Sequence, residues 1–110
     1  MDALLTDAHL RHGGQRFRYT LVIPVGVSTP DEHEATLTHL FGGFTVAATR
    51  GSWVEDDGDI VTENSRTYTI DTDAPDALAS LTRYAAWLRF KGQQDMIYLT
   101  RHPIEDVSVS

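Results

Sequence analysis

The order of two hydrophobic periodicities along the chain most strongly limits the folds it can adopt. Between Gln15 and Val25, apolar and polar residues alternate with a period of two, as in a β-strand with one buried face. The apolar positions of this segment are Phe17, Tyr19, Leu21, Ile23 and Val25. We expect Pro24 either to end regular strand pairing or to lie where its missing N–H does no harm.

A helix is predicted to follow this strand. Thr29 suits the N-cap position, Pro30 suits the first turn, and Glu32 completes a capping box with Thr29. Apolar residues then recur at helical spacing, at Leu37, Leu40 and Phe41. The pair Gly42-Gly43 is predicted to end the helix.

A β-hairpin is predicted next, with strands over Phe44 to Ala48 and Ile60 to Ile70. The pair Asp57-Gly58 between them favours the positive φ angles of a hairpin turn. Gly51 is predicted to mark a bulge or bend in the first of these strands, before Trp53.

A second helix and a fourth strand complete the pattern. The segment Asp73-Ala74-Pro75-Asp76 supplies a capping Asp, and Lys91-Gly92 closes the helix. The apolar stripe of this helix is Leu78, Leu81, Ala85 and Leu88. The last strand is predicted from Gln94 to Arg101, with Pro103 breaking it.

The predicted order is therefore β-α-β-β-α-β, which indicates an α+β, ferredoxin-like sandwich. In this fold a four-stranded antiparallel sheet carries both helices on one face. A chain of 110 residues has room for one domain. We assign residues 15–102 to it, residues 1–14 to an N-terminal arm or short helix, and residues 103–110 to a C-terminal tail or edge strand. The open sheet face predicts a homodimer.

Charge and composition exclude several classes of protein. The chain has 9 basic and 16 acidic residues, a formal net charge of −7, which disfavours nucleic acid and anionic membranes but not a basic protein partner. No apolar run approaches the ~18 residues of a membrane-spanning helix. The N-terminus lacks the pattern of a signal peptide, so we expect a cytoplasmic protein. Without cysteine there is no disulfide and no thiolate nucleophile.

No metal or cofactor is expected from the sequence. His9 and His12 share one side of a possible helix, but two ligands do not make a stable site. His33 and His39 are six residues apart and are expected to point in different directions. The acidic run from Glu55 to Asp59 lacks the ligand spacing of a calcium loop. The glycines form no phosphate-binding fingerprint.

Glu63 is the candidate that the sequence alone leaves open. It lies within the third predicted strand, where an unpaired buried charge is costly. One interpretation is an ion pair with an arginine on a neighbouring strand, for which the candidates are Arg16, Arg18, Arg50 and Arg66. The other is a pocket on the open face, near Trp53, that holds a small polar ligand. Strand parity places Glu63 and Arg66 on opposite faces unless a bulge intervenes.

Several short motifs resemble those of small bacterial and phage proteins of ferredoxin-like type whose activity is not established. In these proteins a Gly-x-Trp turn precedes a Val-x-Glu strand, and a Gln opens the final strand. The matching segments here are Phe44-Thr45-Val46, Gly51-Ser52-Trp53, Val61-Thr62-Glu63-Asn64-Ser65 and Gly92-Gln93-Gln94. The resemblance spans about Leu21 to Thr100. It implies the same fold and directs attention to Trp53, Glu63 and Gln94.

Without a nucleophile, base and metal constellation, the sequence favours a non-catalytic binding module. We expect it to be homodimeric and to recognise a protein partner or a small polar ligand on the open sheet face. The candidate ligand-binding residues are Arg18, Trp53, Glu63, Arg66 and Gln94. Two alternatives are a small enzyme, with Glu63 as general base and Arg18 or Arg66 anchoring an anionic substrate, and an acidic phage-type inhibitor of a basic nucleic-acid-binding protein.

Overall fold

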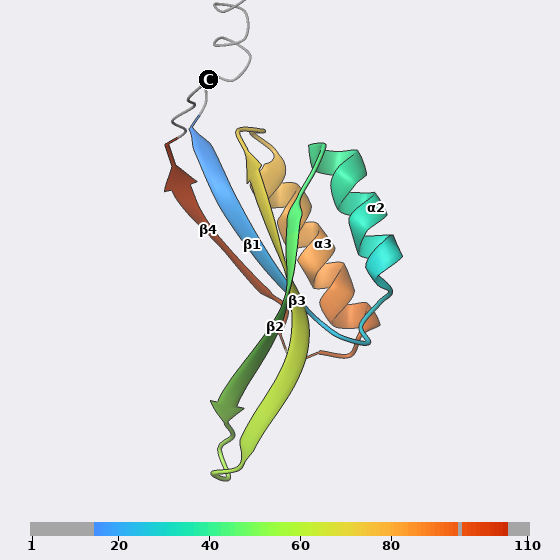
Figure 1. The fold of residues 1–110 in the computed structure, drawn as a ribbon, viewed down its shortest axis with the longest axis vertical. Coiled ribbons are helices and arrows are strands. Elements are labelled where there is room, and N and C mark those ends of the chain that lie inside the picture. The colour runs from blue at the N-terminus through green and yellow to red at the C-terminus, as the bar shows by residue number, and fades with distance from the viewer. Residues whose placement is uncertain (1–14, 95, 106–110) are drawn as a thin grey trace, which may run out of the picture.

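The computed structural model describes residues 15–94 and 96–105, and the predicted N-terminal arm lies outside them. Its elements are β1 (Arg16–Pro24), α2 (Pro30–Phe41), β2 (Thr45–Val54), β3 (Ile60–Thr72), α3 (Ala77–Lys91) and β4 (Tyr98–Ile104). Figure 1 shows them as two helices beside one sheet. In the described part of the chain, no helix has the length and hydropathy needed to cross a membrane.

The sheet has four strands in the order β2-β3-β1-β4, and all neighbouring strands are antiparallel. Both helices pack on the same face of it (Figure 1). The structure therefore confirms an α+β domain with a four-stranded antiparallel sheet and the element order read from the sequence.

The core lies between that face and the helices. Tyr19 and Leu21 of β1 pair with Ile70 and Tyr68 of β3, and all four side chains are buried. The helices complete the core with apolar side chains that are 0% exposed, namely Leu37, Ala77, Leu81 and Leu88. The apolar side chains predicted from the strand and helix periodicities thus lie in one buried layer.

Helix α2 begins and ends where its sequence predicts. The Thr29 hydroxyl accepts a hydrogen bond from the Glu32 backbone N–H at 3.4 Å, and Pro30 occupies the first turn. At the other end Gly42 adopts a φ of 82°, and its N–H donates to the Thr38 carbonyl at 2.8 Å. Only half of the predicted capping box forms, because the Glu32 carboxylate binds Ser28 and Lys91 instead.

The prediction of a bulge at Gly51 is wrong. Gly51 lies opposite Glu63 in an uninterrupted register, and β2 continues through it to Val54. The Asp57-Gly58 turn is confirmed, since Gly58 has a φ of 90°. The Asp57 carboxylate accepts the Asp59 N–H at 2.9 Å, which holds the turn closed.

Two predicted boundaries also move. Helix α3 starts at Ala77 rather than after a capping Asp73, because the Ala77 N–H donates to the Ala74 carbonyl at 3.1 Å in an intervening turn. Strand β4 begins at Tyr98 and includes Pro103, which the sequence predicts to break it. Because β4 is an edge strand, it tolerates the missing N–H of proline.

The hairpin formed by β2 and β3 extends beyond the sheet. The last pair between β1 and β3 joins Pro24 to Ser65, whereas β3 runs on to Ile60 with β2 as its partner. This two-stranded segment, residues 50–64, is called the ribbon below, and Figure 1 shows it projecting from the body. All ten residues of β2 are exposed.

The core assignment predicts different costs for two leucines of α3. Leu81 is 0% exposed and Leu78 is 41% exposed. We expect Leu81→Ala to lower the free energy of unfolding by about 2–5 kcal/mol because it leaves a cavity. Leu78→Ala, the matched control, should cost under about 1 kcal/mol. Urea denaturation measures both, and equal costs would contradict the packing of α3 described here.

Candidate functional site

The sheet face opposite the helices is polar and carries many threonines. By strand register it presents Thr20, Thr45, Thr49, Thr67, Thr69 and Thr100. The hydroxyls of Thr49 and Thr67 lie 2.8 Å apart. β-Branched hydroxyl residues suit a strand and also remain compatible with water. The open face of the sheet therefore needs no apolar cover in its central part.

On the ribbon this same face brings Trp53 and Glu63 near each other. Glu63 lies opposite Gly51, and Trp53 lies opposite Val61, so the two side chains occupy diagonal positions on one face. A Cβ atom at Gly51 would meet nothing within 4 Å, which leaves open space beside Glu63. The Trp53 side chain is 44% exposed, and its indole N–H donates to the Glu55 carboxylate at 3.4 Å.

The Glu63 carboxylate is available for a ligand. Its residue is half-buried, and among residues 15–94 and 96–105 it makes no hydrogen bond or ion pair. The predicted cross-strand ion pair of Glu63 with an arginine is therefore not formed in this part of the chain. A carboxylate with this freedom can hold a cation or accept a proton.

The other predicted site residues lie elsewhere. Arg18 binds Asp71 through two hydrogen bonds, of 2.8 and 2.9 Å, near the opposite end of β3, and this contact lowers the pKa of Asp71. Arg66 pairs with Ile23 on the helix-covered face, as strand parity predicts. Gln94 lies in the turn after α3 and donates to the Gly92 carbonyl. The structure thus brings together Trp53 and Glu63 but not the whole predicted set.

A hollow of 520 Å³ adjoins the Arg18–Asp71 pair, with Phe41 and Phe44 among its lining residues. The two charged side chains of this hollow, Arg18 and Asp71, form an ion pair with each other. It offers a ligand little free charge and no base.

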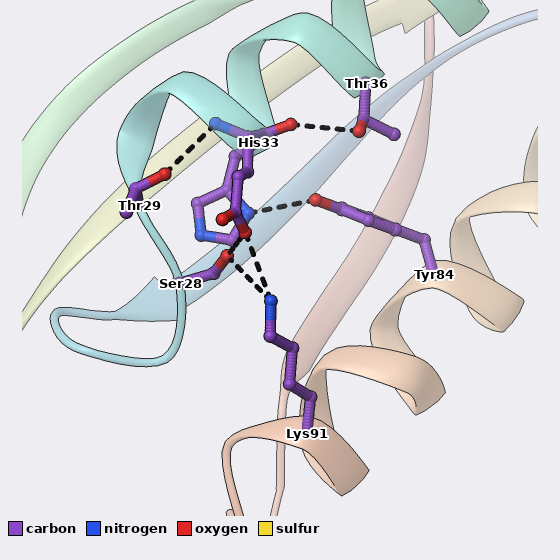
Figure 2. Close-up of polar contacts among 7 residues, drawn as sticks. Ser28, Thr29, His33, Thr36, Tyr84 and Lys91 are labelled. Carbon is purple, nitrogen blue, oxygen red and sulfur yellow. Dashed lines mark hydrogen bonds and ion pairs between the residues drawn. The ribbon is translucent and has the colours of Figure 1, made fainter.

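A polar cluster that the sequence does not reveal joins the two helices (Figure 2). The Glu32 carboxylate accepts hydrogen bonds from the Ser28 hydroxyl and from the Lys91 ammonium group, the latter at 3.1 Å. Both hydrogen bonds lower the pKa of Glu32, and the one from Ser28 contributes most. Lys91 also lies 4.8 Å from the ring centroid of Trp87. The cluster fastens the start of α2 to the end of α3 at the surface.

His33 lies beneath this cluster and is 2% exposed. Its Nδ1 atom lies 2.9 Å from the Tyr84 hydroxyl (Figure 2). Its Nε2 atom and the Tyr68 hydroxyl are buried without a hydrogen-bond partner in the described residues. Burial lowers the pKa of His33 and raises that of Tyr84. Its position four residues before Leu37, on the same side of the helix, is the sequence signal for its burial.

His33 and its neighbours therefore join the two helices through buried contacts. Within the described residues there is no group of three or more His, Cys, Asp or Glu side chains that could hold a metal ion. His39, on the same helix, is exposed, so the two histidines do point in different directions as expected.

Comparisons with known proteins give a likeness in fold. No family model and no curated protein matches the sequence. Among solved structures, the chain is similar to a phage SAM lyase in complex with S-methyl-5′-thioadenosine. The TM-score is 0.64, the sequence identity is 20%, and the match covers 83% of each chain. At this identity the likeness establishes a shared fold.

This likeness corrects the favoured functional interpretation of the sequence. A non-catalytic binding module was expected, partly because the sequence contains no familiar catalytic motif. A solved protein that shares the fold is a SAM lyase in complex with S-methyl-5′-thioadenosine. The enzyme alternative therefore agrees better with this likeness than the non-catalytic module does.

The buried His33 predicts a dependence of stability on pH. Because burial lowers its pKa below the ordinary value of 6.5, the unfolded chain takes up a proton before the folded protein does. The free energy of unfolding should therefore fall as pH decreases from about 7.5 to about 5.5. Glu32 adds a separate loss only below its ordinary pKa of 4.5.

The variant His33→Asn removes this titrating group, and His39→Asn is its control. We expect urea denaturation across the pH range to show a flatter slope for His33→Asn and an unchanged slope for His39→Asn. A steep slope that persists in His33→Asn would assign the pH dependence to other groups.

Proposed function

We propose that the chain is a small enzyme of ferredoxin-like type that cleaves S-adenosylmethionine (SAM) and releases S-methyl-5′-thioadenosine. The fold likeness to the phage SAM lyase supports this proposal.

The observation that carries the proposal is the diagonal placement of Trp53 and Glu63 on one face of the ribbon. SAM contains a sulfonium cation. An indole face and a carboxylate attract such a cation, by a cation–π contact and by charge. A carboxylate that lacks an ion pair within the described residues is free to do so. We therefore place the reacting sulfonium between these two side chains.

In the proposed step, the bond between sulfur and the amino-acid chain breaks, and both electrons go to sulfur, which leaves as a neutral thioether. Glu63 acts as general base and takes a proton from the adjacent carbon, so that a C=C bond forms. The amino-acid fragment is then an unsaturated amino acid. If the substrate's own carboxylate displaces sulfur instead, the fragment is a lactone and Glu63 only binds the cation. Both routes balance without water or a co-reactant.

We also propose that a second copy of the chain covers the ribbon. An isolated two-stranded hairpin is marginally stable in water, and this one exposes Val54 by 66% and Ile60 by 74%. A partner on the ribbon would bury these side chains and exclude water from Glu63, which strengthens its electrostatic effect. This homo-oligomer engages the ribbon, in contrast to the expected dimer through the whole sheet face.

The first prediction of this proposal concerns Glu63. Purified protein should convert SAM to S-methyl-5′-thioadenosine, and Glu63→Gln should lower the rate by roughly 10²–10⁴-fold, as expected for loss of a general base. The control Glu105→Gln changes an exposed carboxylate beyond β4 and should retain full activity. Mass spectrometry of S-methyl-5′-thioadenosine measures the rate. The two candidate amino-acid fragments are isomers of equal mass, so proton NMR, in which only the unsaturated amino acid shows vinyl signals, separates the two routes. A smaller loss in Glu63→Gln would favour the lactone route. An inactive wild-type protein, or a Glu63→Gln variant with full wild-type activity, would refute the proposal.

The second prediction concerns assembly. In sedimentation velocity at micromolar concentration the protein should exceed the 12.3 kDa of a single chain. Ile60→Ser should shift it toward the monomer because it removes apolar surface from the ribbon. Phe90→Ser, at a residue of α3 that is 84% exposed, is the matched control and should not. A wild-type monomer would leave the ribbon without its proposed partner.

A further inference from the structure

A second hollow lies where the ribbon leaves the sheet. It has a volume of 390 Å³, within the range of small-ligand sites. Its lining residues come from the end of β1 and from the middle of β2 and β3, and they are Val25, Ala48, Thr49, Arg50, Asn64, Ser65 and Arg66. Of the ligand-binding residues predicted from the sequence, Arg66 belongs to it and Arg18, Trp53, Glu63 and Gln94 do not.

Strand register sets the two arginines of this hollow side by side. Arg50 lies opposite Asn64, and Arg66 lies opposite Ala48, so the arginines are diagonal neighbours on the helix-side face. Within the described residues, neither guanidinium makes a hydrogen bond or an ion pair. The Asn64 amide lies on the same face and adds further hydrogen-bonding capacity.

This arrangement is unusual for a chain of this charge. Like charges at neighbouring cross-strand positions repel each other. With 16 acidic residues against 9 basic ones, counter-charges for these arginines are abundant in the sequence, yet no acidic residue within 15–94 and 96–105 forms an ion pair with them. An anion supplied from outside the chain would relieve the repulsion.

We propose that the Arg50–Arg66 hollow binds an oxyanion, and that in the working enzyme this is the carboxylate of the substrate's amino-acid part. Two planar guanidinium groups match the paired oxygens of a carboxylate or phosphate. Asn64 follows Glu63 directly in β3, and the edge of β3 is free of β1 from Glu63 onward. A ligand that crosses this edge therefore reaches Glu63 on one face and the arginines on the other. The assignment to the substrate rests on the proposed function, whereas the anion site does not.

The anion site is tested by thermal unfolding at pH 7.5 and constant ionic strength, with acetate or phosphate replacing chloride. We expect acetate to raise the Tm of the wild-type protein by a few degrees (on the order of 2–5 °C) at saturating concentration. Arg50→Gln should abolish this rise. Because Arg50 is exposed, this variant should fold even if Arg66→Gln does not. The control Arg83→Gln, at an exposed residue of α3, should keep it.

Each outcome decides the site. A rise with acetate that Arg50→Gln removes supports a carboxylate site, and a rise with phosphate alone redirects it to a phosphate-bearing ligand and overturns the link to SAM. No anion-specific rise overturns the site altogether. Sedimentation of Arg50→Gln must match the wild type, because dissociation would mean that the arginines bind carboxylates of a second copy instead.

The link to the substrate is tested by kinetics. Arg50→Gln should raise KM for SAM by on the order of tenfold or more, as expected for loss of a hydrogen bond to a charged group. Inhibition by S-methyl-5′-thioadenosine, which carries no carboxylate, should be unchanged. An unaltered KM in an active enzyme overturns the link alone. A wild-type protein without activity overturns the proposed function, while the thermal measurement still decides the anion site.

Discussion

The length difference between β3 and β1 determines most of what is distinctive in this structure. β3 has 13 residues and β1 has 9, so β3 loses its central neighbour at Ser65 and continues with β2 alone. Just beyond this point the Asn64 carbonyl still accepts a hydrogen bond from the Val25 N–H at 3.0 Å, and the register of β1 with β3 ends there. The ribbon, the carboxylate of Glu63 and the arginine hollow all lie at or beyond this point.

The same constraint divides the molecule into two parts. Every buried apolar side chain of the described residues belongs to the body, in β1, the inner half of β3, the two helices and the segments flanking them. The ribbon contributes none of them. Binding elements commonly come from segments of low local stability, because they must adapt to a ligand or a partner. A stable body that carries a sparsely packed ribbon fits that pattern.

The sequence predicted those features that depend on local physical chemistry. Helix α2 is an example, since the Thr29 cap and the Gly42 terminator act within one turn. Strand parity also placed Glu63 and Arg66 on opposite faces, because the side-chain period of a strand is fixed. The predicted bulge at Gly51 does not form, because glycine permits a bulge without requiring one.

Features that depend on packing between distant segments could not be predicted from the sequence. The contact of His33 with Tyr84 joins residues 51 positions apart and exists only because the two helices lie side by side. The arginine hollow likewise needs the register of β2 against β3, which pairs Arg50 with Asn64. The favoured non-catalytic interpretation was corrected by a likeness of the whole fold, which no short sequence motif records.

The most direct test of the Trp53–Glu63 site is an NMR titration with S-methyl-5′-thioadenosine. The chain has two tryptophans, Trp53 on the ribbon and Trp87 on α3, so each indole N–H gives a separate signal and one serves as the control for the other. Binding at the proposed site should shift the Trp53 indole signal and the Glu63 amide and leave Trp87 unchanged. Shifts confined to Trp87, or to residues around Arg18 and Asp71, would contradict it.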